Sequence, residues 1–213
     1  EFVYLKKIVS YLFFLSIILV GIPVIPVQAA DNDVLSSEEA LLRLKQIADS
    51  YDLYEPLSEK DAEFIRTYAK PASAKDGEVG ILGKKTWNFD RTKYNSNRSV
   101  GLWMKGSVYS DIGIVNNSFG GSYNSYVIAG SSRAYQIQHT IRHTAYGAIG
   151  SGGTYIGKVY DGSITNTCKK NGIITCSTND SKSYVASVAY SSTWVTSKVW
   201  YDSGSTLSVS TAE

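Results

Sequence analysis

The alternation of side chains between Tyr135 and Ala145 is the feature that most constrains what this chain can fold into. Every second position there carries tyrosine, isoleucine, histidine or alanine, and the positions between them carry glutamine, threonine or arginine. Successive side chains of a β-strand point to opposite faces of its sheet. A period of two therefore predicts a strand whose two faces differ in polarity.

Similar patterns recur through residues 79–213. Val100, Leu102, Met104 and Val108 share one face of another predicted strand, in which we expect Gly106 to mark a bulge. Glycine-rich and Asp-Ser-Gly stretches separate further predicted strands at 154–160, 184–190, 193–201 and 206–210. We therefore predict a mainly β fold, an antiparallel β-sandwich or barrel.

An acidic segment at 31–71 predicts a short α-helical hairpin before this β domain. Ser36 and Glu39 have the spacing of a capping box, and Ser58 and Asp61 repeat it in a weaker form. Apolar residues then recur at helical spacing in both halves, and Pro71 ends the second helix. Helices this short are marginal alone, so we expect them to pack on each other or on the β domain. Residues 72–78 read as a linker.

The first thirty residues resemble a bacterial-type signal peptide. Lys6 and Lys7 precede an apolar run at 8–20, and Val27-Gln28-Ala29 offers small residues where signal peptidase cuts. We predict cleavage after Ala29 or Ala30 and secretion to the extracellular side. A retained membrane anchor is the alternative, because the run extended to Val27 approaches the ~20 residues that span a bilayer. The prolines and the lack of a following basic cluster favour release.

Cys168 and Cys176 are the only cysteines, and outside the cytoplasm such a pair predicts one disulfide. Asn171-Gly172 between them is a strong signal for a hairpin turn. A two-residue turn leaves the cysteines one position out of register, so the bond requires a bulge or a longer loop. We predict a disulfide-stapled hairpin that presents Lys169 and Lys170 at its tip.

Charge divides the exported chain into two parts of opposite sign. Residues 31–71 carry ten acids and five bases, a net charge of −5, whereas residues 72–213 carry eight acids and fourteen bases, a net charge of +6. A division of this kind indicates that the two parts have different roles or act on each other.

Residues able to carry catalysis are few. His139 and His143 are the only histidines and share one strand face, but they lack the glutamate and the helix of a zincin motif, so we interpret them as structural. There is no G-x-S-x-G motif, and the carboxylates after residue 71 are thinly spread. We predict no catalytic residue, no metal and no cofactor, and an enzyme is the less favoured class.

Aromatic and basic side chains suggest binding instead. Tryptophan and tyrosine suit sugar rings, partner proteins and membrane interfaces, although many of them serve only as core. Trp194 and Trp200 fall on one face of a single predicted strand. The candidate binding residues are Trp103, Trp194, Trp200, Lys169 and Lys170.

These features favour a secreted, non-enzymatic effector, toxin-like or antimicrobial in the manner of a bacteriocin. In this hypothesis the acidic hairpin covers the basic β domain until proteolysis near residues 70–78, and the partner is an anionic cell envelope or membrane surface. The candidate contacts include Lys84 and Lys85 as well as Lys169 and Lys170.

Two alternatives remain open. An extracellular glycan or cell-wall binding module would keep the helices permanently. The other alternative is a secreted hydrolase or hydrolase inhibitor, and the sequence provides no motif for either. We exclude nucleic acid as a partner, because the basic residues are dispersed and the chain is exported.

Overall fold

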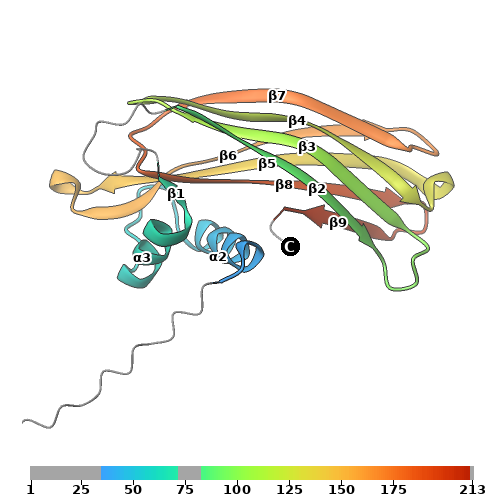
Figure 1. Cartoon of the computed structure of the whole chain (residues 1–213), viewed down its shortest axis with the longest axis horizontal. Helices are drawn as coiled ribbons and strands as arrows, with labels where there is room; N and C mark the ends of the chain where they lie inside the picture. Colours follow the sequence, from blue (N-terminus) through green and yellow to red (C-terminus); the bar gives the residue numbers. More distant parts are fainter. Residues whose placement is uncertain (1–34, 72–82, 212–213) are drawn as a thin grey trace, which may run out of the picture. The chain divides into compact units, whose positions relative to one another are not determined.

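Two antiparallel sheets face each other and form a β-sandwich, preceded by a hairpin of two α-helices (Figure 1). The computed structural model describes residues 35–71 and 83–211. The predicted signal peptide at 1–30 and the linker at 72–78 lie outside these residues. The described sheets remain separate, which resolves the predicted choice between sandwich and barrel.

Each sheet combines strands from distant parts of the sequence. Sheet A has the order β1-β8-β5-β6, with β9 also paired to β8, and sheet B has the order β2-β3-β4-β7. The strands of sheet A are β1 (Lys70–Pro71), β5 (Ala134–Ile149), β6 (Tyr155–Lys169), β8 (Tyr190–Tyr201) and β9 (Thr206–Ser210). Those of sheet B are β2 (Lys84–Tyr94), β3 (Gly101–Ile112), β4 (Asn116–Ala129) and β7 (Thr175–Val185). Two short 3₁₀ turns, Ser131–Arg133 and Ser151–Gly153, lie in the loops before β5 and β6.

The alternating segment is the central strand β5, as its pattern predicts. Ile137 and Ile141 are fully buried between the sheets. Successive side chains alternate between the faces of a strand, so Ala145 and Tyr146 lie on different sides, and the pairing with β6 shifts register between them. Ala145 joins the core between the sheets, whereas Tyr146 is buried beneath the helices. Strand β5 is therefore covered on both faces at this point.

Strand β3 confirms the predicted apolar face but not the predicted bulge. Leu102 and Met104 are fully buried, yet the register shift lies between Gly101 and Leu102. Gly106 instead pairs regularly with Tyr123, and a Cβ atom at this glycine would lie 2.3 Å from the Tyr123 Cβ atom. The glycine is explained by the close approach of this tyrosine.

The strand boundaries near the C-terminus agree only in part with those predicted from the sequence. Strand β9 has the predicted bounds, and β8 contains the predicted 193–201. The predicted strand at 184–190 is wrong, because β7 ends at Val185 and a loop follows. The Asn117 side chain holds this loop through a 2.8 Å hydrogen bond to the Ala186 carbonyl.

The disulfide between Cys168 and Cys176 is confirmed, but the hairpin predicted around it is wrong. Cys168 lies in β6 of sheet A and Cys176 in β7 of sheet B, so the bond ties the two sheets together across a Cα distance of 5.8 Å. Asn171 and Gly172 do form a turn, in which the Ile173 amide donates to the Lys170 carbonyl. The turn signal was right, but the partners of the flanking strands are set by distant residues.

The helices α2 (Ser37–Ser50) and α3 (Glu59–Tyr68) form as predicted. The reciprocal capping box of Ser36 and Glu39 is present, and Ser58 caps α3 by accepting from the Asp61 amide. Their apolar stripes lie on the outer face of sheet A, where Ile47 and Ile65 cluster with Tyr146. No helix among the described residues is long and apolar enough to cross a membrane.

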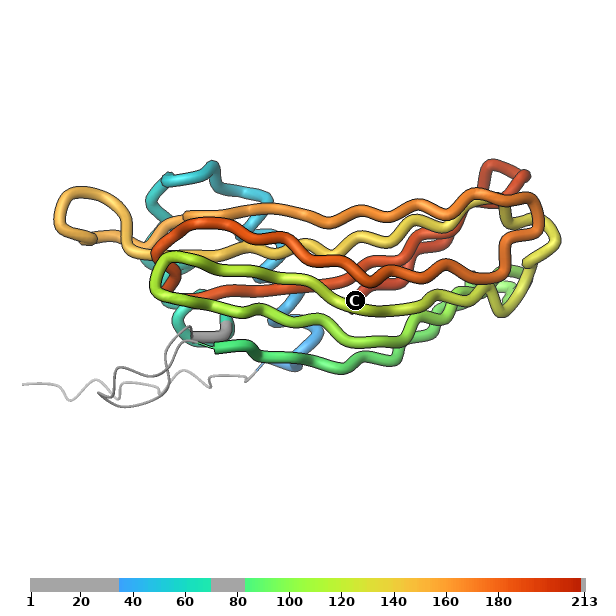
Figure 2. The backbone as a smooth tube through the Cα atoms, turned by 90° about the horizontal axis from the view of Figure 1, so that it is seen from above, coloured from blue at the N-terminus to red at the C-terminus, as the bar shows by residue number. Residues whose placement is uncertain are grey.

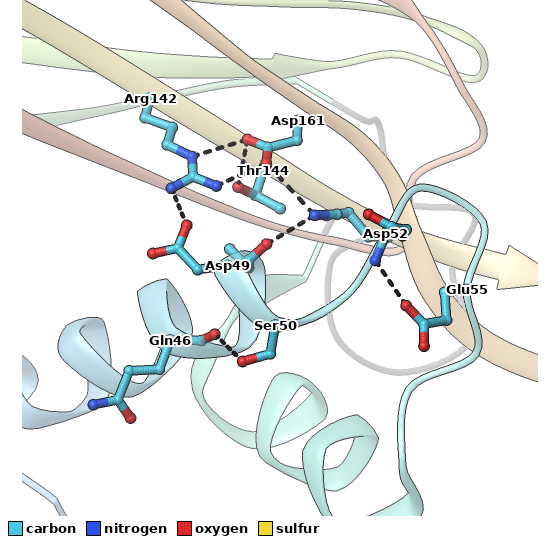
Figure 3. Close-up of polar contacts among 10 residues, drawn as sticks. Gln46, Asp49, Ser50, Asp52, Glu55, Arg142, Thr144 and Asp161 are labelled. Carbon is cyan, nitrogen blue, oxygen red and sulfur yellow. Dashed lines mark hydrogen bonds and ion pairs between the residues drawn. The ribbon is translucent and has the colours of Figure 1, made fainter.

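A charged cluster fixes α2 to sheet A (Figure 3). Arg142 of β5 pairs with Asp49 of the helix and with Asp161 of β6, the latter at 2.7 Å. Its bonds to Asp161 raise the pKa of Arg142, with further help from Asp49. Burial raises the pKa of Asp161, but the bonds and charge of Arg142 outweigh burial and lower it. The buried Lys158 ammonium donates to the Ala48 carbonyl at 2.8 Å.

Backbone hydrogen bonds also join the helical segment to both sides of sheet A. The Tyr54 amide donates to the Lys158 carbonyl and the Leu57 amide to the Ile156 carbonyl, so the loop between the helices lies along β6. On the other side β1 pairs with the start of β8. These contacts make residues 35–71 part of the folded body.

Trp194 and Trp200 provide a matched test of how much the helices contribute. Trp194 is 3% exposed beneath α2, whereas Trp200 lies on the same strand face beyond the helices and is half-buried. We expect Trp194→Ala to lower the free energy of unfolding by about 3–5 kcal/mol and Trp200→Ala by less than about 1 kcal/mol. Urea unfolding monitored by circular dichroism measures both, and equal losses would contradict the assigned packing.

Candidate functional site: the basic end of the sandwich

Four loops meet at one end of the sandwich, on the right in Figures 1 and 2, away from the end that carries the helices. They connect β2 to β3, β4 to β5, β6 to β7, and β8 to β9. Five exposed cationic side chains lie on or beside these loops, with Asp202 as the acid among them. We call this surface the basic end and define it by Lys93, Arg98, Arg133, Lys169 and Lys170.

The cations of the basic end are held near the surface. The Arg98 guanidinium lies 4.5 Å from the centre of the Tyr94 ring, and the Arg133 guanidinium donates to the Ser99 carbonyl. Among the described residues, no carboxylate forms an ion pair with Arg98, Arg133, Lys169 or Lys170. Their positive charge therefore remains available to an anionic partner.

Exposed apolar side chains accompany these cations. Ile174 is 59% exposed beside the disulfide, and Tyr126 at the nearby end of β4 is 38% exposed. Large apolar side chains at a surface that also carries charge are typical of interaction sites. The exposed members of this group are Tyr94, Tyr126, Ile128, Tyr135 and Ile174.

The loops of the basic end are tied to one another. The Lys170 amide donates to the Tyr135 carbonyl at 3.0 Å, and the Val127 amide to the Ile174 carbonyl at 2.9 Å. The Asp202 amide donates to the Arg133 carbonyl, and the disulfide adds a covalent tie. A surface fixed in this way loses less conformational freedom when it binds.

Four of the five predicted binding residues lie at this end. Lys169, the last residue of β6, and Lys170, which follows it, are both exposed. Trp200 lies in the same cross-strand row as Lys169, on the outer face of sheet A. Trp103 lies on the outer face of sheet B, near the same loops. Trp194 is buried beneath α2, so its surface is not available in this structure.

Lys84 and Lys85, the other predicted envelope contacts, lie at the far end of the sandwich. They begin β2, whereas Lys93 lies near the other end of this strand and Arg98 follows it. Arg98 and Arg133 were missed because each is an isolated arginine in a polar loop. Only the strand pairing places them at the same end of the sandwich as Lys169.

His139 and His143 lie between the sheets and belong to a buried polar layer. The His143 ring nitrogens contact the Thr193 hydroxyl at 2.7 Å and the Tyr184 hydroxyl at 2.8 Å. His139 Nδ1 contacts the Thr178 hydroxyl at 2.7 Å, and its Nε2 has no hydrogen-bond partner among the described residues. The two sheets are joined nearby by a 2.8 Å bond between Ser125 and Ser197.

This geometry suits structural histidines. Four residues along one strand correspond to a separation of about 13 Å, too far for both rings to hold one ion. No group of three or more His, Cys, Asp or Glu side chains that could hold a metal exists in the part of the chain that the structure describes. Burial lowers the pKa of His139 to about 4 and that of His143 to about 3.

The sequence matches no protein-family model, and a search of curated proteins finds no match.

The buried histidines predict a stability that depends on pH. Both are neutral in the folded protein down to about pH 4, whereas the unfolded chain protonates them below their ordinary pKa of 6.5. The unfolded state therefore binds more protons between pH 6.5 and 4. In this window the free energy of unfolding falls as pH falls, by up to about 1.4 kcal/mol per pH unit for each histidine.

Urea unfolding at half-unit pH steps measures this slope. His139→Gln and His143→Gln each remove one titrating group, so each variant should lose about half of the slope between pH 6.5 and 4. Below pH 4 stability is also lost through the protonation of carboxylates such as Asp161, whose pKa is lowered in the folded protein. A slope unchanged in both variants would show that the buried histidines do not set it.

Proposed function

We propose that this protein is a secreted, non-enzymatic, toxin-like effector that binds an anionic cell envelope through its basic end. The observation that carries the proposal is the convergence of Arg98, Arg133, Lys169 and Lys170 with exposed tyrosine and isoleucine side chains on loops that are held together. Cations draw a protein to an anionic surface, and interfacial aromatic side chains hold it there.

The charge layout supports this orientation. Charges act together on a surface only within about 10 Å at ordinary salt, so a cluster is more effective than a dispersed net charge. The acidic helices pack on the opposite half of sheet A, around Arg142 and Tyr146. An anionic surface would therefore attract the basic end and repel the helical side.

The precursor part of the proposal changes in one respect. The hairpin contacts Tyr146, Trp194 and Arg142, and it leaves Lys169 and Lys170 exposed. Its removal would thus uncover a second, aromatic surface and would not be needed to free the basic end. The expected cleavage region near residues 70–78 lies almost entirely outside the described residues.

Charge reversal at the basic end tests the envelope contact. Each Lys or Arg near an anionic membrane contributes about 1 kcal/mol, so Lys169→Glu with Lys170→Glu should weaken binding at least about thirtyfold. Sedimentation with vesicles of phosphatidylglycerol and phosphatidylcholine measures this, with pure phosphatidylcholine as the uncharged reference. Binding by the unaltered protein should also fall as salt rises.

The matched control is Lys60→Glu with Lys182→Glu, which makes the same change in net charge on exposed residues of α3 and β7. It should retain most of the binding. Equal losses in both double variants would show that overall charge decides, and failure of the unaltered protein to bind anionic vesicles would exclude this partner.

Mass spectrometry of the secreted protein tests the processing. We expect a mature chain that begins between residues 70 and 85 and gains two protons on reduction of the disulfide. Because residues 35–71 hydrogen-bond to β6 and β8, a cleaved hairpin would stay attached under native conditions. Denaturing and native spectra are therefore both required. A chain that begins at Ala30 or Asp31 would refute the precursor and favour a glycan-binding module with permanent helices.

A further inference from the structure

The outer face of sheet B carries a second candidate surface that differs in chemistry from the basic end. Trp103 of β3 and Tyr126 of β4 are opposite each other, with their rings stacked at a centroid distance of 5.0 Å. The indole Nε1 donates to Asp90 Oδ1 at 2.5 Å, which fixes the orientation of the Trp103 ring. The two rings each cover one face of the other, so the aromatic platform that the pair offers is the ring surface outside this stack, and Tyr126 is 38% exposed.

Polar groups continue from this platform along the two strands. The next outward row places Lys105 beside Asn124, and the following row places Ser107 beside Ser122. Ser177 of β7 donates to Asn124 Oδ1 at 2.5 Å, which turns the amide N–H groups of Asn124 away from that neighbour. Hydrogen-bond donors and acceptors thus lie beside the rings.

A second aromatic residue ends this strip. Tyr109 lies six residues beyond Trp103 on the same face of β3, about 20 Å away at the usual rise of a strand. The Lys84 ammonium lies 3.8 Å from the centre of its ring. We call this surface the sheet B strip, which consists of Trp103, Lys105, Ser107, Tyr109, Ser122, Asn124 and Tyr126.

Charge and shape identify the class of ligand. Lys105 Nζ lies 3.5 Å from Asp90, so the middle of the strip is close to neutral and offers little to a phosphate or an acidic polymer. A lipid surface is disfavoured because contact with Trp103 would also bury the Asp90 carboxylate. Sugar rings have an apolar face for an aromatic platform and a rim of hydroxyls for polar neighbours.

We propose that the sheet B strip binds an uncharged, β-linked polysaccharide whose chain runs along β3 and β4. Alternate residues of β3 from Trp103 to Tyr109 form an extended row about 20 Å long, which suits an extended polymer. The proposal is distinct from that for the basic end, because it requires none of the cations of that end and a ligand without charge. Tyr126 lies at the border of the two surfaces and belongs to both. One protein could then hold an envelope surface and a wall polymer.

Binding of soluble hexasaccharides to the full chain tests this. Isothermal titration with cellohexaose and chitohexaose should show binding of at least one, unchanged between low and high salt because the ligand is uncharged. Maltohexaose, whose α-linked chain curves, should bind at least tenfold more weakly. Failure of both β-linked hexasaccharides at millimolar concentration, or equal binding of maltohexaose, would overturn the proposal.

Variants locate the site. Trp103→Ala and Tyr126→Ala should each weaken hexasaccharide binding at least tenfold, and Asn124→Ala should weaken it severalfold with little risk to the fold. Tyr155→Ala, at the other end of sheet A, is the aromatic control; this tyrosine is 55% exposed and the variant should bind normally. Equal losses with Trp103→Ala and Tyr155→Ala would place the site elsewhere and refute the strip.

The two surfaces give separate readouts. The double variant Lys169→Glu with Lys170→Glu should bind the hexasaccharide as the unaltered protein does, although it should lose anionic vesicles. The Asn124→Ala variant should bind anionic vesicles as the unaltered protein does, and its binding of the hexasaccharide should be weakened. Loss of vesicle binding alone would therefore count against the basic end without affecting the strip, and loss of hexasaccharide binding alone would count only against the strip.

Discussion

The burial of β5 on both faces is the constraint on which the rest of this structure depends. Its inner face, with Ile137 and Ile141, requires sheet B as a cover. Its outer face carries Tyr146, and the helical hairpin covers this aromatic side chain. The hairpin occupies that half of sheet A, which leaves the loops at the other end of the sandwich exposed. The basic end is exposed because the helical hairpin covers β5 at the opposite end of the sandwich.

Short-range sequence patterns were sufficient to predict the helix caps and the apolar faces of strands, because these depend on residues close together in the sequence. The capping box of Ser36 and Glu39 and the apolar face of β3 depend on residues a few positions apart, and the disulfide was expected from a single pair of cysteines in a chain with a predicted signal peptide. Strand pairing is a different matter, because it depends on residues far apart in sequence. The Asn171-Gly172 turn therefore joins two sheets and forms no hairpin, although the turn itself was predicted.

For the candidate site, the sequence predicted individual binding residues but not which of them lie together in the structure. Trp103 and Trp200 were selected as tryptophans of predicted strands, and Lys169 and Lys170 by their place beside the predicted turn. Strand pairing brings all four to one end. Trp194 has the same residue type and strand face as Trp200, yet it is buried, because no local pattern states where a helix will pack. Tyr126 and Asn124 were missed, since their role depends on being opposite Trp103 and Lys105 across the sheet.

The disulfide between β6 and β7 also has a mechanical consequence. These strands are the outermost members of their own sheets, and the bond joins them where the basic end would be anchored. A tensile force applied at Lys169 or Lys170 would pass into both sheets at once, because the covalent tie bypasses the turn between the two cysteines. Neither edge strand could then be peeled away alone, and rupture would require the two sheets to shear together. An anchored molecule of this design would resist detachment by flow.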